Sequence, residues 1–172
     1  TQVQLARAIN LAIDQGAHVL DISGGQFMPS GEAYPLLANI VKSCERRGVL
    51  IVAAAGNDGC DCLHIPGALP TVLAVGAMDR RGEPMSSSNW GSKYREQGLL
   101  APGEEIPGAR PGGGIATSSG TSFSTAVVSG VAALLASLQL KRGGPIDLLA
   151  VRDALIRSAD GCDPDERTLE CQ

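Results

Sequence analysis

The sequence predicts an α/β fold in which a mostly parallel sheet carries helices on both faces. Helical patterns alternate with short apolar segments of strand length along the chain. Continuous apolar runs such as VLIVAAAG, residues 49–56, are typical of strands that are buried on both faces. With 172 residues, of which 44% are hydrophobic, the chain is long enough for one domain with a substantial core and too short to expect two.

The first half of the chain alternates helix and strand. Residues 3–17 repeat apolar side chains at helical spacing, and Gly16 is typical of a helix stop. HVLDIS, residues 18–23, predicts a short strand. Residues 31–48 repeat the helical pattern and end in basic residues and a glycine, which suit a helix C-terminus. The buried strand at 49–56 follows.

The second half begins with TVLAVGAMD, residues 71–79, which predicts a third buried strand. Residues 80–114 are rich in Gly, Pro and Ser, so we expect irregular or hairpin structure there. A helix is predicted over residues 122–140 and a second near PIDLLAVRDALIRSA, residues 145–159. We find no internal repeat and no interdomain linker.

Charge and hydropathy argue against two classes of partner. The net charge is −4, the isoelectric point is near 5.1, and only 14 residues are Lys or Arg, so no basic stripe for a nucleic acid is expected. The longest apolar runs are about ten residues and are broken by Gly or Ser, whereas about 20 are needed to span a bilayer. We therefore expect no nucleic-acid partner and no membrane partner.

In a parallel sheet, ligand sites form outside the carboxyl ends of the strands, which directs attention to two glycine-containing loops. The first follows the strand at 18–23 and contains Ser23, Gly24 and Gly25, and the second contains Asn57. Taken alone, the first loop is a tight turn and Asn57 a turn residue that tolerates a left-handed backbone. Alternatively, the glycines allow close approach of a ligand and Asn57 supplies an amide donor.

GTSFSTAVVSG, residues 120–130, places Ser122 just before a buried helix. A serine at such a position is most often a helix cap, because its hydroxyl accepts a bond from a free backbone N–H in the first turn. The alternative is a nucleophile, and that choice depends on the rest of the chain.

Four motifs, AAAGN, IPGALPTVLAVGAMD, LAPG and GTSFSTAVVSGVAALL, occur in the order and roughly the spacing of the subtilisin-like serine peptidases, and this resemblance covers nearly the whole chain. More narrowly, GNDGCDCLHIPGALPTVLAVGAMD and SLQLKRG resemble the subtilases that process cyanobactin precursor peptides. Those enzymes excise or macrocyclise a short core peptide. The resemblance implies a three-layer, subtilisin-like architecture and a peptide substrate.

The resemblance also implies roles for individual residues. Ser122 matches the nucleophile and Asn57 the side-chain donor of the oxyanion hole. Three residues match the edge that pairs with the substrate backbone: Ser23, Gly24 and Gly25. Three more match the wall of the pocket for the residue before the cut bond: Ala54, Ala55 and Gly56. His64 falls near the floor of that pocket, either in contact with the substrate or as a plain loop residue.

The sequence departs from the family at several positions. Ala126 stands where many subtilisins have proline, and Phe123 and Ser124 replace a common Met-Ala pair. Proline is favoured but not required in a first helical turn. The loop LDISGGQ, residues 20–26, is one residue shorter than the usual subtilisin form.

The larger departure concerns the catalytic triad of the subtilisins, whose members follow one another along the chain in the order Asp, His and Ser. The chain contains two histidines, His18 and His64, and neither matches the family's catalytic histidine motif. We therefore expect residues 1–172 to be the C-terminal two-thirds of one peptidase domain, with an upstream segment that carries the catalytic Asp and His as its partner. A fragment that binds peptides without cutting them is the alternative. A nucleotide-binding domain is not expected, because no strand precedes a Gly-rich phosphate fingerprint.

The five cysteines suggest disulfides rather than a metal site. Cys162 and Cys171 enclose a short polar loop, so a disulfide that pins the tail at 159–172 is expected. Cys44 is expected to reach the loop that carries Cys60 and Cys62. The CDC spacing completes no zinc site, and we expect no metal and no cofactor. Disulfides favour an oxidising compartment, whereas cyanobactin-type processing implies the cytoplasm, which is the location we expect.

Overall fold

The computed structural model describes residues 1–159, and its centre is a sheet of four parallel strands in the order β1-β3-β5-β6. The strands are β1 (Val19–Ile22), β3 (Leu50–Ala54), β5 (Leu73–Met78) and β6 (Gly98–Pro102). Leu20 is aligned with Ile51 and Ala53 with Ala74, so β3 and β5 lie in the middle of the sheet. Both central strands are buried along nearly their whole length, as continuous apolar runs predict.

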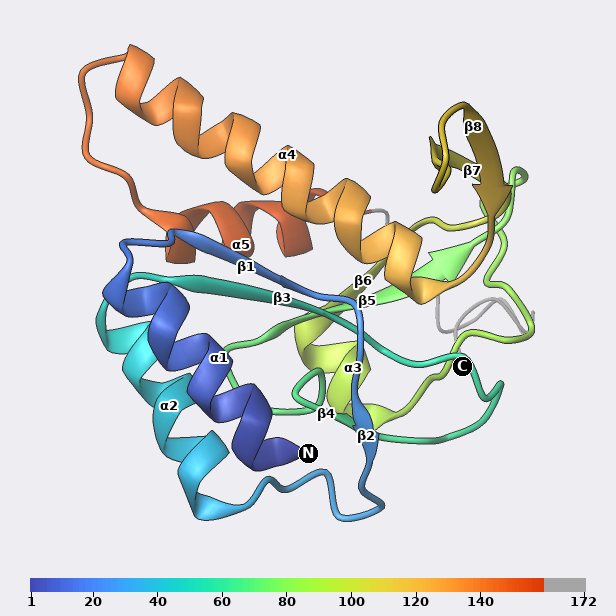
Figure 1. Cartoon of the computed structure of the whole chain (residues 1–172), viewed down its shortest axis with the longest axis horizontal. Helices are drawn as coiled ribbons and strands as arrows, with labels where there is room; N and C mark the ends of the chain where they lie inside the picture. The colour runs from blue at the N-terminus through green and yellow to red at the C-terminus, as the bar shows by residue number, and fades with distance from the viewer. Residues whose placement is uncertain (160–172) are drawn as a thin grey trace.

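Helices cover both faces of the sheet (Figure 1). One face carries α1 (Gln2–Asp14) and α2 (Pro35–Arg46), and the other carries α4 (Thr121–Lys141) and α5 (Leu148–Ser158). Side chains of β3 alternate between the two layers: Ile51 packs in the core with α1 and α2, and Val52 packs in the core with α4 and α5. The predicted α/β class and its three layers are confirmed.

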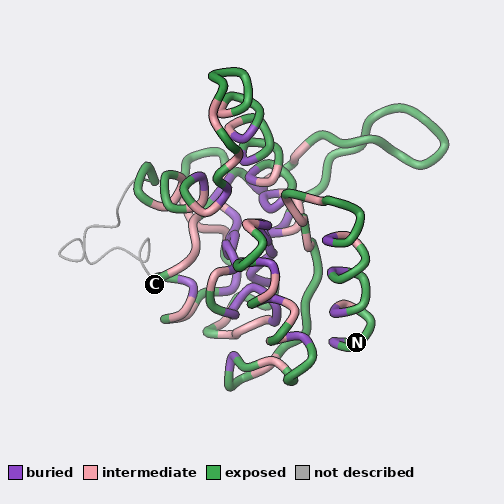
Figure 2. The backbone as a smooth tube through the Cα atoms, turned by 90° about the vertical axis from the view of Figure 1, so that its left-hand side faces the viewer, coloured by how far each residue is buried: buried purple, intermediate pink, exposed green. Residues whose placement is uncertain are grey.

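Local sequence signals set the limits of α1. Thr1 caps its N-terminus by accepting a hydrogen bond from the Gln4 N–H, and the Gln4 side chain completes a capping box. Ala6, Ile9 and Ile13 lie on one buried side of α1, which faces the body of the protein in Figure 2. Gly16, with φ of 82°, ends the helix as the sequence predicted.

Smaller elements surround the sheet. They are β2 (Gln26–Phe27) paired antiparallel with β4 (His64–Ile65), α3 (Ser92–Gln97), and the antiparallel hairpin of β7 (Ile106–Ala109) and β8 (Ile115–Ser118). The β7–β8 hairpin stands off from the sheet (Figure 1), and nearly all of its residues are exposed. Its C-terminal strand leads directly into α4.

The prediction for residues 80–114 was incomplete. The segment contains the first strand of the hairpin, whose second strand follows at Ile115–Ser118, but it also contains α3 and the parallel edge strand β6. Gly98 begins β6 so close to its neighbours that an added Cβ would lie 2.6 Å from the Tyr94 carbonyl oxygen and 3.1 Å from that of Ala74. A glycine is therefore needed where β6 begins to pair with β5. Because glycine is also typical of loops, the composition of residues 80–114 did not indicate a strand there.

The expected partner of Cys44 was wrong. Cys60 and Cys62 form a disulfide with each other, and Cys44 is a free thiol on the buried side of α2, with 1% of the residue exposed. Burial raises the pKa of the Cys44 thiol to about 11. The predicted Cys162–Cys171 bridge lies outside the described residues.

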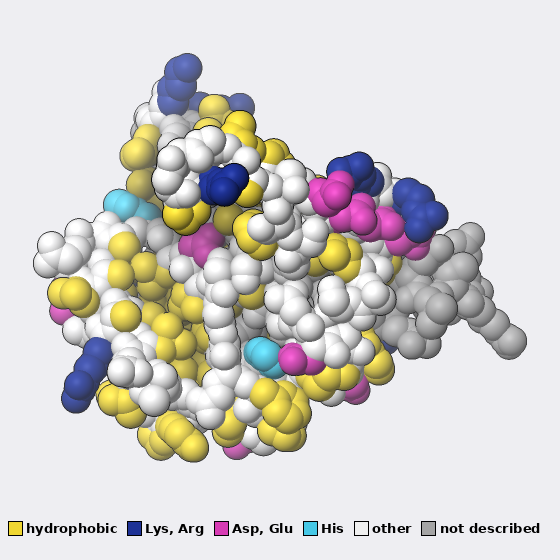
Figure 3. Space-filling view, turned by 45° about the vertical axis from the view of Figure 1, so that its right-hand side comes forward, with side chains coloured by type: hydrophobic (Ala, Val, Ile, Leu, Met, Phe, Trp, Pro, Cys, Tyr) yellow, Lys and Arg dark blue, Asp and Glu magenta, His cyan; other side chains and the backbone are white. Residues whose placement is uncertain are grey.

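One described helix, α4, is long and apolar enough to cross a membrane by length and composition alone. The core helix of a globular domain meets the same criterion, and α4 packs across the sheet through Val128, Ala132 and Ala136. Other α4 side chains are at least one-third exposed: Val127, Val131, Leu134, Leu138 and Leu140. Hydrophobic side chains also reach the surface over much of the face drawn in Figure 3.

Candidate active site

Ser122 lies in the first turn of α4, opposite the end of β1. Gly120 is the N-cap of α4 and the helix has no side-chain cap, so the cap role considered for Ser122 is not what the structure shows. Instead, the Ser122 hydroxyl donates a hydrogen bond to the Ser23 carbonyl oxygen at 3.0 Å. Ser23 Oγ in turn lies 3.0 Å from the Ser122 carbonyl oxygen and 2.9 Å from Asp21 Oδ1. These contacts join the loop after β1 to the first turn of α4, which lie 99 residues apart in the sequence.

Asn57 lies beside Ser122 with one end of its amide fixed. The Thr121 N–H donates to Asn57 Oδ1 at 2.9 Å. Gly120, with φ of 131°, makes room for the amide, because an added Cβ would lie 3.1 Å from Asn57 Oδ1. Within residues 1–159, Asn57 Nδ2 donates no hydrogen bond, so this N–H group remains available to a ligand.

Thr121 joins the first turn of α4 to the segment that follows β3. Its side chain is fully buried, and its Oγ1 accepts a hydrogen bond from the Gly56 N–H at 3.3 Å. The N–H groups of the first turn of a helix lack partners inside the helix, so the backbone N–H of Ser122 is a second potential donor beside Asn57. Two free N–H donors at one site are what the stabilisation of an oxyanion requires.

A pocket of about 280 Å³ opens at this point. Its lining contains nearly all the residues predicted from the sequence: Ser23, Gly24, Gly25, Ala54, Gly56, Asn57, His64 and Ser122, together with Asp58 and Thr121. Ala55 is the exception, because it is 2% exposed and supports the wall from behind through its carbonyl oxygen. The structure therefore brings both glycine-containing loops and the serine to one place.

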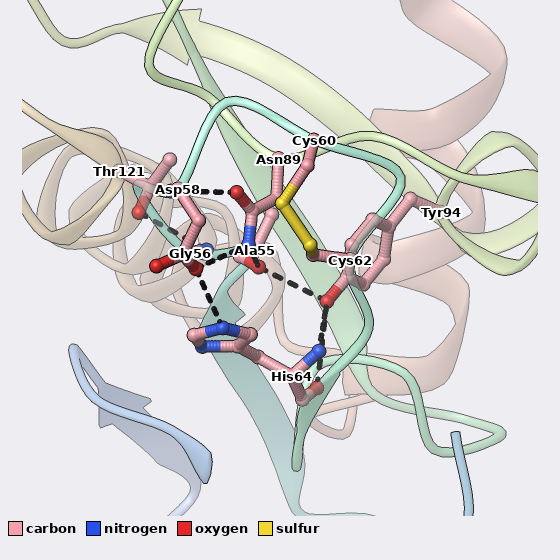
Figure 4. Close-up of polar contacts among 9 residues, drawn as sticks. All are labelled: Ala55, Gly56, Asp58, Cys60, Cys62, His64, Asn89, Tyr94 and Thr121. Carbon is pink, nitrogen blue, oxygen red and sulfur yellow. Dashed lines mark hydrogen bonds and ion pairs between the residues drawn. A yellow bond between two sulfur atoms is a disulfide. The ribbon is translucent and has the colours of Figure 1, made fainter. Parts of the chain in front are cut away.

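A polar network that the sequence did not predict holds the side of the pocket that contains His64 (Figure 4). His64 Nε2 lies 2.8 Å from Asp58 Oδ2, although the contact is not aligned as a good hydrogen bond. Asn89 Nδ2 donates to the same oxygen at 3.0 Å and also to the Ala55 carbonyl oxygen. The hydrogen bond from Asn89, followed by the nearby His64, holds the pKa of Asp58 below its usual value.

Tyr94 holds the backbone of Ala55 and His64 beside the pocket. Its hydroxyl donates to the Ala55 carbonyl oxygen at 3.0 Å and accepts from the His64 N–H at 2.6 Å. Burial raises the pKa of Tyr94 to about 12, so its hydroxyl remains a donor at neutral pH. Asp58 was visible in the sequence beside Asn57, but no local pattern marks Asn89 or Tyr94.

The remaining histidine is elsewhere. His18 is exposed at the start of β1, and its carbonyl oxygen accepts from the Leu50 N–H. Within residues 1–159, the hydroxyl of Ser122 is hydrogen-bonded to a backbone carbonyl and to no histidine. The same residues contain no cluster of three or more His, Cys, Asp or Glu side chains that would hold a metal ion.

Comparison with curated proteins finds serine proteases. The chain is 36% identical to the M-protease of Shouchella clausii (strain KSM-K16) over 131 residues, which is 76% of this chain and 33% of that protein. It is 34% identical to the thermophilic serine proteinase of Bacillus sp. (strain AK1) over 160 residues, or 93% of this chain and 37% of the relative. The chain thus spans about a third of the length of these relatives.

Solved structures extend the similarity. The prenylagaramide maturation protease PagA superimposes with a TM-score of 0.93 at 53% identity, covering 95% of this chain and 59% of that one. The patellamide maturation protease PatA gives 0.95 at 56% identity, covering 99% and 64%. The PatG macrocyclase in complex with peptide gives 0.92 at 41% identity, covering 95% and 50%. With the subtilase family profile matching residues 1–170, the chain belongs to the subtilase family.

Proposed function

We propose that this chain is the serine-bearing part of a subtilisin-like peptidase that cuts a peptide through an acyl-enzyme on Ser122, in the maturation of a ribosomal precursor of the cyanobactin type. The observation that carries the proposal is the shared pocket of Ser122, Asn57 and the loop at Ser23. Similarity to maturation proteases for prenylagaramide and patellamide supports the substrate class.

The geometry suggests the following chemistry. Ser122 Oγ attacks the peptide carbonyl, a base accepts the hydroxyl proton, and the carbonyl electron pair moves onto oxygen. Asn57 Nδ2 and the Ser122 N–H stabilise that oxyanion. When the oxyanion collapses, the base gives its proton to the leaving nitrogen, the C–N bond breaks to release the amine, and the ester remains on Ser122. We assign the base and its orienting carboxylate to a segment preceding Thr1, since neither His18 nor His64 is placed beside the Ser122 hydroxyl. The cytoplasm remains the location that we propose.

A macrocyclase is the second candidate. The PatG macrocyclase also superimposes on this chain. In that case an amine, instead of water, attacks the acyl-enzyme, and the product is lighter by one water than the product of hydrolysis. Mass spectrometry of the released peptide distinguishes the two outcomes.

The test uses the protein produced together with its preceding segment. A fluorophosphonate probe should label Ser122, and Ser122→Ala should abolish labelling. Ser137→Ala is a matched control, because Ser137 is exposed on the same helix and, among residues 1–159, its hydroxyl bonds to the Ala133 carbonyl oxygen alone. Labelling that persists in Ser122→Ala, or peptide binding with neither labelling nor cleavage, would instead support a protein that binds peptides without cutting them.

A further inference from the structure

A groove of about 300 Å³ lies on the surface between α1 and α2, which lie side by side over one face of the sheet (Figure 1). Its apolar lining comes from both helices: Ala6, Leu11, Leu36 and Ile40. Leu11 is 64% exposed and Leu36 is 53% exposed, so the fold buries neither side chain. None of the residues that line this groove lines the pocket that holds Ser122, and the proposed chemistry does not use them.

Opposite charges lie along the α1 side of the groove. Arg7 is exposed and, among residues 1–159, its guanidinium has no hydrogen bond or ion pair. Asp14 is held in place, because Asn10 Nδ2 donates to its Oδ2 at 2.9 Å and Arg47 lies 3.3 Å from its Oδ1. Its side chain is nevertheless 54% exposed. Each carboxylate oxygen has two lone pairs, so Asp14 can accept a further hydrogen bond.

The spacing of these charges makes the groove complementary to a copy of itself. Arg7 and Asp14 are seven residues apart, so they lie on the same side of α1 and about 10 Å apart along its axis. Leu11 lies between them. A two-fold axis that crosses α1 near Leu11 places a second α1 antiparallel to the first, and each Arg7 then lies opposite the Asp14 of the other copy. Packed helix axes are about 8–10 Å apart, a distance that the two side chains span together.

We propose that two copies of this chain associate through the groove between α1 and α2, with Leu11 and Leu36 of each copy buried against the other. Two ion pairs between Arg7 and Asp14 of opposite copies flank the apolar contact. Burial of the leucines supplies the driving force, and the ion pairs fix the antiparallel orientation and the register. The occupant is a second copy, because it carries exposed apolar side chains between a cation and an anion at the same spacing and in the reverse order.

The test measures mass in solution on the protein produced with its preceding segment. Sedimentation velocity over a range of protein concentrations should show a monomer–dimer equilibrium. Leu11→Glu should raise the Kd of the dimer by about tenfold or more, because it places two like charges next to the two-fold axis. Lys42→Glu is the control, because Lys42 is an exposed α2 residue that does not line the groove, and this change should leave the Kd unaltered.

Exchange of the charges tests the pairing itself. Arg7→Glu should raise the Kd by about tenfold or more, because each new carboxylate faces the Asp14 of the other copy. Asp14→Arg should do the same, since each new guanidinium faces an Arg7. The double variant Arg7→Glu/Asp14→Arg has opposite charges across the axis again, so its Kd should return to within about threefold of the unaltered value. Thermal unfolding checks that each variant is folded.

The outcomes separate the alternatives. A monomer at every concentration of the unaltered protein would overturn the proposal, whether or not the variants fold. A dimer that Leu11→Glu leaves intact would show that the contact lies elsewhere and would also overturn it. A double variant as weak as the two single variants would exclude the antiparallel pairing of Arg7 with Asp14. Loss of the dimer in Leu11→Glu together with its recovery in the double variant supports the proposed interface.

Discussion

At the scale of single residues, the two ends of the Asn57 amide do different things. Its oxygen accepts from the Thr121 N–H, and its nitrogen is open to the pocket. Because the amide oxygen already has a partner, the side chain cannot turn over without losing a hydrogen bond. Asn57 is therefore oriented before substrate arrives, which is the condition under which a donor accelerates a reaction.

This orientation gives the first prediction. Asn57→Ala should lower kcat by about 10²-fold or more with little change in KM, because the donor acts on the oxyanion and not on the bound peptide. That magnitude is the one measured for the equivalent asparagine in subtilisin. Steady-state kinetics on the protein with its preceding segment is the measurement. Asn39→Ala on the exposed side of α2 is the control, and an unchanged kcat in Asn57→Ala would exclude the assigned role.

Sequence motifs predicted most of the site because its members lie at sharp local features, a glycine turn and the start of an apolar helix. Ser122, Asn57 and Ser23 all reach the same pocket. Asn89 and Tyr94 could not be predicted, because their importance comes from contacts with Asp58, Ala55 and His64, which are distant in the sequence. Cys44 was misassigned for the same reason, since spacing alone does not give the direction of a side chain.

At the scale of elements, helices and buried strands with long periodic patterns were predicted, and short elements were not. β6 and α3 are brief and lie in a segment rich in turn residues, so tertiary packing decides their conformation. The glycine within α4, Gly130, does not mark a close approach to the sheet, because no atom of another element lies within 4 Å of its Cβ position. α4 instead contacts the sheet through Val128 and Ala132.

The turn after β5 gives a prediction of pH dependence. Asp79 Oδ1 accepts from the Arg81 N–H at 2.8 Å and the Glu83 N–H at 3.0 Å, and these bonds, the first above all, lower the pKa of Asp79. A carboxylate with a lowered pKa stabilises the folded state above its unfolded pKa of about 3.9, and this contribution is lost as pH falls through the folded pKa. The Tm of Asp79→Asn should therefore lie below that of the unaltered protein at pH 7, and this difference in Tm should disappear below about pH 4. Thermal unfolding at the two pH values is the measurement, and a difference in Tm that is the same at both would contradict this account.

At the scale of the whole molecule, the described residues form a layered core but leave one surface apolar. Along α4, Val127, Val131, Leu134 and Leu138 are 37%, 39%, 68% and 46% exposed and recur at helical spacing. An aliphatic surface of this kind on a core helix is typical of an interaction site. The solved relatives PagA and PatA are longer than this chain, which covers 59% and 64% of them.

We therefore predict that residues 1–172 alone do not hydrolyse peptides at an enzymatic rate and are prone to aggregate. A serine without its base retains about 10³–10⁴-fold acceleration over water, which is too slow for ordinary assays. Addition of the preceding segment should restore solubility and probe labelling, measured by light scattering and mass spectrometry. Robust turnover by the purified chain that His18→Ala or His64→Ala abolishes would refute the prediction.

The contact between Ser122 and Ser23 has a consequence for synthesis. The two residues lie 99 positions apart, and the ribosome releases the chain from its N-terminus. The loop after β1 leaves the ribosome well before α4 does, so Ser23 is present in the nascent chain before its partner Ser122. The pocket that both segments line is therefore completed only after the first turn of α4 has been synthesised.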